Sequence, residues 1–366
     1  MNADPKLRDR FERAAGSMDV DAAPWLDRVH VAATRRERSR RVQALAVAAV
    51  ITVAILAVAW ELRAGGSNRV VMGGTMTGQI AFLGSQGSAD RTLFTFDLAG
   101  GNPVEVGEGP VLWAAWSPDG SRLATIIGQP GSSPRSSVVV SGPDGSDPVT
   151  VYGTADTGLV GPDVLNLSWA PDGARLAVAA RAPGQGRTIV IVDARGRAEP
   201  TVLDGTWESV SWSPDGERLL AIGFPTGAPE RFDIYTMRPD GSDLVQLTDD
   251  GVGEHNASWS PDGASIAFAE GGEYDQDVFV MEADGENVRR LTGWEGIDIL
   301  PVWSPDGDWI AFASDREATD AQQERNRGME RMWSGLSMFV MRADGSDAFR
   351  VFDAGDGAAL PTSWAP

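Results

Sequence analysis

The sequence predicts an all-β protein: a six-bladed β-propeller with one blade closed by N- and C-terminal strands, preceded by a single transmembrane helix and a short helical cytoplasmic tail. Three observations predict this. A Trp-centred motif recurs every 43 to 61 residues, the two ends of the repeat region carry complementary parts of one unit, and an uncharged apolar segment lies near the N-terminus. We therefore assign residues 1–41 to the tail, 42–60 to the helix, 61–77 to a linker and 78–366 to the propeller.

The tail is the first element and differs from the rest in charge. Residues 1–41 carry ten basic and seven acidic side chains, whereas the remaining 325 residues carry 21 and 45. Leu7 and Phe11 fall at helical spacing, and Trp25 begins a second apolar face after a proline. The tail either lies on the anionic inner membrane surface or forms a helical hook for a cytoplasmic protein partner through Leu7, Phe11 and Trp25.

The apolar segment from Val42 to Trp60 has the length of a membrane span. Its 19 residues carry no charge and would extend about 28 Å as a helix, close to the ~30 Å hydrocarbon thickness. Five arginines precede it, so the positive-inside rule places the N-terminus in the cytoplasm and the propeller outside. A cleaved signal peptide is one alternative, although the 41-residue lead is too long for one, and a buried soluble helix is another.

The repeat motif predicts the propeller. It begins at six tryptophans, and a short apolar strand, a loop, an alternating strand and an Asp-Gly turn follow each full copy. The tryptophans are Trp116, Trp169, Trp212, Trp259, Trp303 and Trp364. Units of this length with Pro-Asp-Gly and Asp-Gly turns are typical of four-stranded blades, in which we expect the tryptophans to be core and the turn aspartates to be structural.

The two ends of the repeat region complement each other. Residues 79–82, 93–96 and 103–106 read as the later strands of a unit that lacks its Trp strand, and the missing strand is at Trp364. Five whole units and one split unit then give six blades. Pairing of the two ends would close the ring and leave no exposed sheet edge; a linear array is the alternative.

The repeat resembles a known type. The W-S-P-D-G turn, the I-A-F strand, the aromatic-Val-Met strand and the D-G-S turn resemble the TolB-type β-propeller repeat, a WD40-like repeat, over roughly residues 78–366. The resemblance implies a six-bladed platform that binds proteins or ligands. The periplasmic member of that family has a cleaved signal and an additional α/β domain, which this sequence lacks, so a role in the Tol–Pal system does not carry over.

Composition excludes several classes of function. The net charge of −21 disfavours nucleic-acid binding by the bulk of the chain. The chain has no cysteine and only two histidines, His30 and His255, so disulfides, thiolate metal sites and His-rich metal centres are excluded. We therefore expect no cofactor, no resident metal and no nucleic-acid partner.

The loop-bearing face of the propeller is the expected binding face, because the turns on the other face are tight and uniform. Six polar or aromatic residues precede the tryptophans, where the links reach the channel mouth: Trp113, Asn166, Glu208, Glu254, His255 and Asp298. Carboxylates around a pore can bind a cation or a sugar, and the alternative is that they only hydrate the channel. A hydrolase using Glu208, His255 and Asp298 is a remote alternative, since no G-x-S-x-G motif accompanies His255.

A link of about 23 residues that begins after Ala313 is longer than the corresponding links of 8 to 11 residues. Residues 317–332 are predicted to form a helix capped by Asp315. We predict that it docks a partner, the alternative being a solvated excursion. The expected contact residues are Glu317, Arg325, Arg327, Met329, Met332 and Trp333.

The first interpretation is thus a membrane-anchored, extracytoplasmic binding module of the cell envelope. The alternative is a transmembrane regulator whose tail binds a transcription component, because a basic tail, one anchor and an outer domain resemble the layout of anti-sigma-type regulators. That resemblance is one of architecture only, and the zinc motif of many such regulators is missing.

Overall fold

The computed structural model describes most of the predicted propeller. The described residues are 78–85, 91–98, 102–107, 110–129, 135–153, 159–160, 166–182, 186–228, 232–272, 274–319, 322–323, 335–355 and 357–366. The predicted tail, transmembrane helix and linker lie outside these ranges. Within them, none of the helices has both the length and the apolar character needed to cross a membrane.

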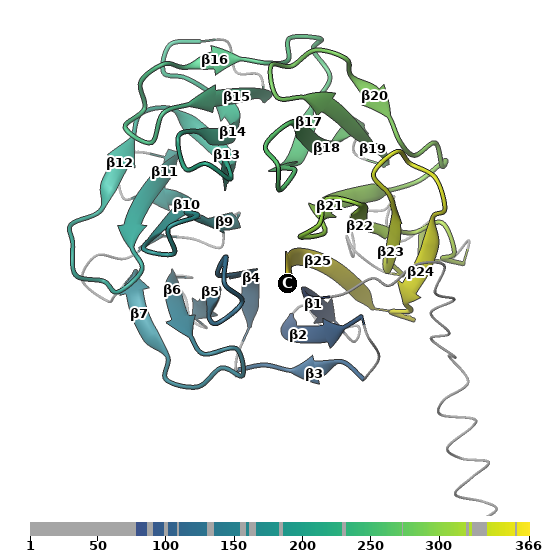
Figure 1. Ribbon diagram of the computed structural model, residues 1–366, viewed down its shortest axis with the longest axis horizontal. Coiled ribbons are helices and arrows are strands. Elements are labelled where there is room, and N and C mark those ends of the chain that lie inside the picture. The colour runs from purple at the N-terminus through teal and green to yellow at the C-terminus, as the bar shows by residue number, and fades with distance from the viewer. Residues whose placement is uncertain are drawn as a thin grey trace, which may run out of the picture. The chain divides into compact units, whose positions relative to one another are not determined.

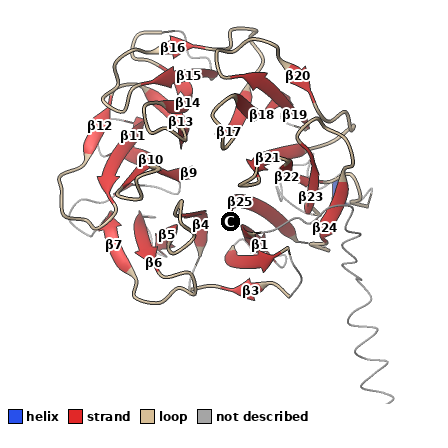
Figure 2. Cartoon of the chain, viewed as in Figure 1, coloured by secondary structure: helices blue, strands red, loops and turns tan. Residues whose placement is uncertain are grey.

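The described residues form six antiparallel sheets arranged in a ring, as predicted (Figure 1). Almost all of them are strand, turn or loop (Figure 2). We number the sheets as blades from the N-terminus. Blade 1 contains β25 (Ala358–Ala365), β1 (Gln79–Ser85), β2 (Thr92–Asp97) and β3 (Val104–Glu105). Blade 2 contains β4 (Val111–Trp116), β5 (Leu123–Gln129), β6 (Arg135–Ser141) and β7 (Val149–Tyr152), with β8 (Leu159–Val160) paired to β6.

The other four blades repeat this order from the inside outward. Blade 3 contains β9 (Asn166–Trp169), β10 (Arg175–Ala182), β11 (Gly186–Asp193) and β12 (Thr201–Leu203). Blade 4 contains β13 (Thr206–Trp212), β14 (Leu219–Phe224), β15 (Asp233–Met237) and β16 (Val245–Gln246). Blade 5 contains β17 (Glu254–Trp259), β18 (Ser265–Gly272), β19 (Asp275–Glu282) and β20 (Arg289–Arg290). Blade 6 contains β21 (Asp298–Trp303), β22 (Trp309–Ser314), β23 (Ser337–Arg342) and β24 (Phe349–Phe352).

The joint blade closes the ring, which confirms the prediction from the two chain ends. Strand β25 pairs antiparallel with β1, so that Trp364 lies opposite Ile80 and Leu360 opposite Leu83. The Trp strands of all six blades are innermost and contact one another around the centre (Figure 1). Apolar side chains between neighbouring blades form the core, and Phe268 and Phe312 are both fully buried.

The turns after the Trp strands explain the repeated Ser-Pro-Asp-Gly sequence. In blade 2 the Ser117 hydroxyl donates to Asp119 at 2.6 Å, and Asp119 accepts the Ser121 N–H at 3.1 Å. These hydrogen bonds lower the pKa of Asp119 to about 2. The glycine at the end of each of the five turns has φ between +64° and +76°, a conformation that strains other residues. The expected structural role of the turn aspartates is therefore confirmed.

The long link of blade 6 is described only in part. Gln322 and Gln323 are helical, and the other residues of the predicted 317–332 helix that the structure describes, 317–319, are turn or irregular. The carboxylate of Asp315, the predicted cap, accepts the backbone N–H of Ile297 at 2.9 Å. Asp315 therefore ties the base of the insertion to the start of β21.

Candidate functional site

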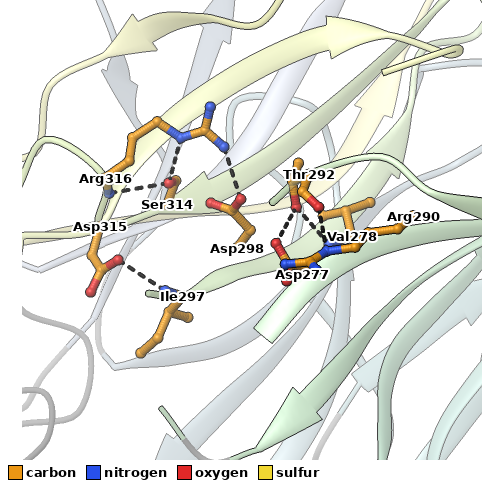
Figure 3. Close-up of polar contacts among 9 residues, drawn as sticks. All are labelled: Asp277, Val278, Arg290, Thr292, Ile297, Asp298, Ser314, Asp315 and Arg316. Carbon is orange, nitrogen blue, oxygen red and sulfur yellow. Dashed lines mark hydrogen bonds and ion pairs between the residues drawn. The ribbon is translucent and has the colours of Figure 1, made fainter. Parts of the chain in front are cut away.

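Three acidic side chains near the start of the inner strands were predicted together, and the structure places two of them in ion pairs. Glu208 of β13 pairs with Arg187 of β11. Asp298 of β21 is fully buried and accepts from the Arg316 guanidinium at 2.9 Å (Figure 3). Arg316 also stacks on Phe339, with its guanidinium carbon 4.8 Å from the ring centre. In both places a cation neutralises the carboxylate.

Glu254 of β17 is the exception. Its side chain is fully buried, and neither carboxylate oxygen has a hydrogen-bond partner within the described ranges. Two other acids approach it: one carboxylate oxygen each of Asp250, Glu254 and Glu270 lie within 4.8 Å of one another. Burial is the main cause that raises the pKa of Glu254 to about 8, the Thr248 hydroxyl opposes the shift, and Asp250 and Asp233 add to it. Burial and the Asp250 charge likewise raise the pKa of Glu270.

This geometry predicts a pH-dependent stability in the absence of divalent cations. Because the folded state holds a proton on Glu254 up to about pH 8, and the unfolded state loses it near 4.5, the free energy of unfolding should fall as pH rises between those values. Asp233 and Tyr235 of β15, Asp250 of the link and Glu270 of β18 face the same carboxylate. Urea unfolding in a chelator from pH 5 to 9 measures the slope. If the free energy of unfolding depends on pH in the same way in the parent and in Glu254→Gln, this prediction is wrong.

The central cavity holds two of the other predicted residues. Trp113 and Asn166 line a cavity of about 80 Å³ to which each of the six inner strands contributes. The Asn166 amide bridges blades 3 and 4, since it donates to Ser209 and accepts the Val210 N–H. None of the four titratable residues of the predicted set, Glu208, Glu254, His255 and Asp298, lines this cavity. Burial lowers the pKa of His255, which favours its neutral form. A binding role for the six residues stays a prediction.

A second hollow lies on the opposite face, between blades 5 and 6. It has a volume of about 690 Å³, and its lining includes Trp303, Ser265 and Arg289. In two other blades, an arginine lies over the equivalent tryptophan. Trp169 and Trp212 are each covered by an arginine from the preceding blade's turn, Arg122 and Arg175, both 4.7 Å from the ring centre.

At the position of these arginines, blade 5 has Ser265, the second residue after its Pro-Asp-Gly turn. Trp169 and Trp212 are 6% and 4% exposed, whereas Trp303 is only partly buried. The surroundings are acidic, since Asp262, Asp306, Asp308 and Asp344 line the hollow together with one arginine. Hydrogen bonds from Ser260 and Ser346 lower the pKa of Asp262 and Asp344, so both remain ionised at neutral pH.

Predicted contact residues of the insertion and tail are mostly outside the described ranges. Glu317 is described and forms an ion pair with Arg350 of β24. Arg325, Arg327, Met329, Met332 and Trp333 are not described, nor are Leu7, Phe11 and Trp25 of the tail.

Two features of the described residues were not predicted from the sequence: the acids near Glu254 and the open face of Trp303. Asp250 and Glu270 were not singled out, although the hairpin centred on Pro261-Asp262-Gly263 suggests that Glu270 lies near Glu254. The absent arginine at Ser265 was visible on aligning the repeats.

Comparison with known proteins agrees with the geometry. Residues 253–323 match the family model of the TolB beta propeller domain. TolB from Acinetobacter baumannii is 20% identical with a TM-score of 0.61, and the match covers 79% of this chain and 67% of that one. A putative TolB from Agrobacterium tumefaciens is 21% identical with a TM-score of 0.57, covering 80% and 100%. A chain of a nidogen/laminin complex is 11% identical with a TM-score of 0.53, covering 79% and 98%. No curated protein sequence matches this chain. At these identities the structural likeness shows the fold alone.

Proposed function

We propose that this TolB-like six-bladed propeller is a protein-binding module of the cell envelope, held outside the cytoplasm by residues 42–60. The match of residues 253–323 to the TolB beta propeller domain and the closed ring support a binding platform. The uncharged segment behind five arginines supports the anchor and its orientation.

The uncovered face of Trp303 is the observation that carries the proposal. Two other blades show which group this repeat accepts over the equivalent tryptophan, namely an arginine guanidinium. Between blades 5 and 6, none of the described arginines stacks on Trp303, and four aspartates line the hollow that it borders. A partner that inserts an arginine would gain a cation–π contact and charge complementarity at once. We therefore propose that an arginine-presenting protein occupies this hollow, which we call the Trp303 groove.

Replacing Ser265 by Arg should close the groove from within. The new side chain would stack on Trp303 as Arg122 stacks on Trp169, and should raise the free energy of unfolding by about 0.5–1 kcal/mol. Binding of the peptide Ac-Gly-Gly-Arg-Gly-Gly-NH2, followed through the Trp303 indole signal in NMR spectra, should weaken at least tenfold. A Trp303→Phe variant assigns that signal.

The matched control is Ala264→Arg, which adds the same charge one residue earlier, at an exposed position of the same turn. This variant should bind the peptide nearly as well as the parent, because the arginine at position 264 does not occupy the stacking position over Trp303. Equal peptide binding by Ser265→Arg and the parent would overturn the groove as the binding site. Equal binding of an all-glycine peptide would do the same.

The loop-bearing face offers a second candidate surface for the same function. Trp294, in the link between β20 and β21, is 40% exposed, and its indole and the Asp315 carboxylate both border Gly296 at the base of the insertion. Exposed tryptophans are frequent energetic centres of protein interfaces. Crosslinking of the full-length protein in its membrane separates the two surfaces. Ser265→Arg should abolish partner capture. If capture survives Ser265→Arg and is lost only when residues 320–334 are deleted, the binding site lies on the loop-bearing face instead.

A further inference from the structure

We propose that Asp250, Glu254 and Glu270 form a Ca²⁺ site at the junction of blades 4 and 5. The three carboxylates have one oxygen each within 4.8 Å of the others, a spacing that oxygens at the usual 2.3–2.6 Å from a shared Ca²⁺ satisfy. This site is separate from the Trp303 groove, and its existence does not depend on the proposed protein partner.

The buried carboxylate of Glu254 requires a compensating positive charge or a proton. The corresponding inner-strand acid of blade 6, Asp298, is equally buried and is compensated by Arg316. Within the described ranges, Glu254 forms no ion pair, and neither oxygen has a partner in hydrogen-bond geometry; the nearby Thr248 hydroxyl lowers its pKa but supplies no charge. An isolated ionised carboxylate is strongly disfavoured in the interior. Blade 6 thus places an arginine beside its fully buried acid, whereas blade 5 places two further acids, Asp250 and Glu270, beside Glu254.

The local backbone brings the acids together. Glu254 and Glu270 are opposite residues of the β17–β18 ladder, so their side chains lie on one face of the sheet. The register of this ladder shifts between His255 and Ser258, where Asn256 has φ +54°. Asp250 precedes Gly251 (φ +78°) in the link from β16, and one of its carboxylate oxygens accepts the Val252 N–H at 2.8 Å. Its other oxygen is available to a cation.

The chemistry of the donors selects a hard cation. All three groups are carboxylates and the chain has no cysteine, so oxygen-preferring Ca²⁺ and Mg²⁺ are favoured over Zn²⁺. The donors differ in burial, from the enclosed Glu254 to the exposed Asp250, so solvent can complete the coordination. Ca²⁺ accepts such irregular sets, whereas Mg²⁺ demands near-ideal octahedral geometry and retains its waters. Bound Ca²⁺ would displace the Glu254 proton and fasten the inter-blade link to blade 5.

The test uses the full-length protein in detergent, freed of cations with a chelator, and CaCl₂ as the ligand. Isothermal titration at pH 7.5 should show one site with Kd of about 10⁻⁴–10⁻³ M, the range of extracellular modules. Ca²⁺ at a hundredfold excess over Kd should raise the midpoint of thermal unfolding by roughly 5 °C. MgCl₂ should raise it less.

Glu254→Gln and, separately, Asp250→Asn should each weaken Ca²⁺ binding at least tenfold. Asp250 is exposed, so its variant keeps the test valid if Glu254→Gln fails to fold. The matched control is Glu295→Gln, which removes one exposed acid from the equivalent link of the next blade and should leave the Ca²⁺ response intact. Absence of any response of the parent up to 10 mM CaCl₂ would overturn the site. An unchanged response in both site variants, or an equal loss in the control, would do so too.

Discussion

A chain that ends at Gly357 is expected to show no cooperative unfolding transition. The truncation removes β25, the innermost strand of blade 1, whose residues pair with seven residues of β1 from Gln79 to Ser85. It also removes the neighbour that β4 and β21 contact at the centre of the ring. The inner edge of β1 would then expose its unpaired backbone groups along its whole length.

The lost burial is large compared with the stability of a domain. Leu360 and Trp364 are 3% and 8% exposed, and Trp364 packs in the core shared by blades 1 and 6. Complete burial of one large apolar side chain contributes about 1.5–3 kcal/mol, and whole domains are stable by only about 5–15 kcal/mol. Loss of these side chains together with the seven residue pairs between β1 and β25 and the ring closure should therefore leave no stable propeller.

Circular dichroism during heating and in urea measures this expectation. The control chain lacks only Pro366, which is exposed and follows β25, and it should unfold at the parent's midpoint. A chain ending at Gly357 that unfolds cooperatively near the parent's midpoint would show that the ring does not depend on the joint blade.

The architecture of the propeller was predictable from the sequence because its determinants are local. Each Ser-Pro-Asp-Gly turn closes on itself through hydrogen bonds within five residues, and each glycine marks a backbone conformation of positive φ. Five such turns, together with the sixth repeat tryptophan Trp364, indicate six blades. The joint blade followed from matching the strand near Gln79 to Trp364, since only the missing half of a unit could complete it.

The environment of the candidate site was less predictable because it depends on contacts between distant segments. Asp298 is paired with Arg316, 18 residues away, and Glu208 with Arg187, 21 residues earlier in the chain. The sequence identified all three inner-strand acids, but it did not show that two are neutralised and that Glu254 instead meets Asp250 and Glu270. A count from the Pro261-Asp262-Gly263 turn pairs Glu254 with Glu270, as the structure does, whereas the approach of Asp250 depends on the path of the link between blades 4 and 5.

Arg316→Ala should destabilise the propeller by about 3–5 kcal/mol, because it leaves the fully buried Asp298 carboxylate without its cation. One oxygen of Asp298 already has no hydrogen-bond partner among the described residues, and the other receives its charged donor from Arg316. Urea denaturation at pH 7 measures the loss. Arg238→Ala is the control, since it breaks the pair with Asp243, in which both side chains are more than half exposed, and should cost less than about 1 kcal/mol.

Arg316 also packs on Phe312 and Phe339, so the variant removes apolar contact as well as charge. A double variant with Asp298→Asn separates the two effects. If the uncompensated carboxylate dominates, the double variant should recover about half or more of the stability lost in Arg316→Ala, because no buried charge remains. If packing dominates, Asp298→Asn should recover nothing. A cost for Arg316→Ala no greater than that of the Arg238 control would contradict the electrostatic argument, and with it the inference that Glu254 needs a cation.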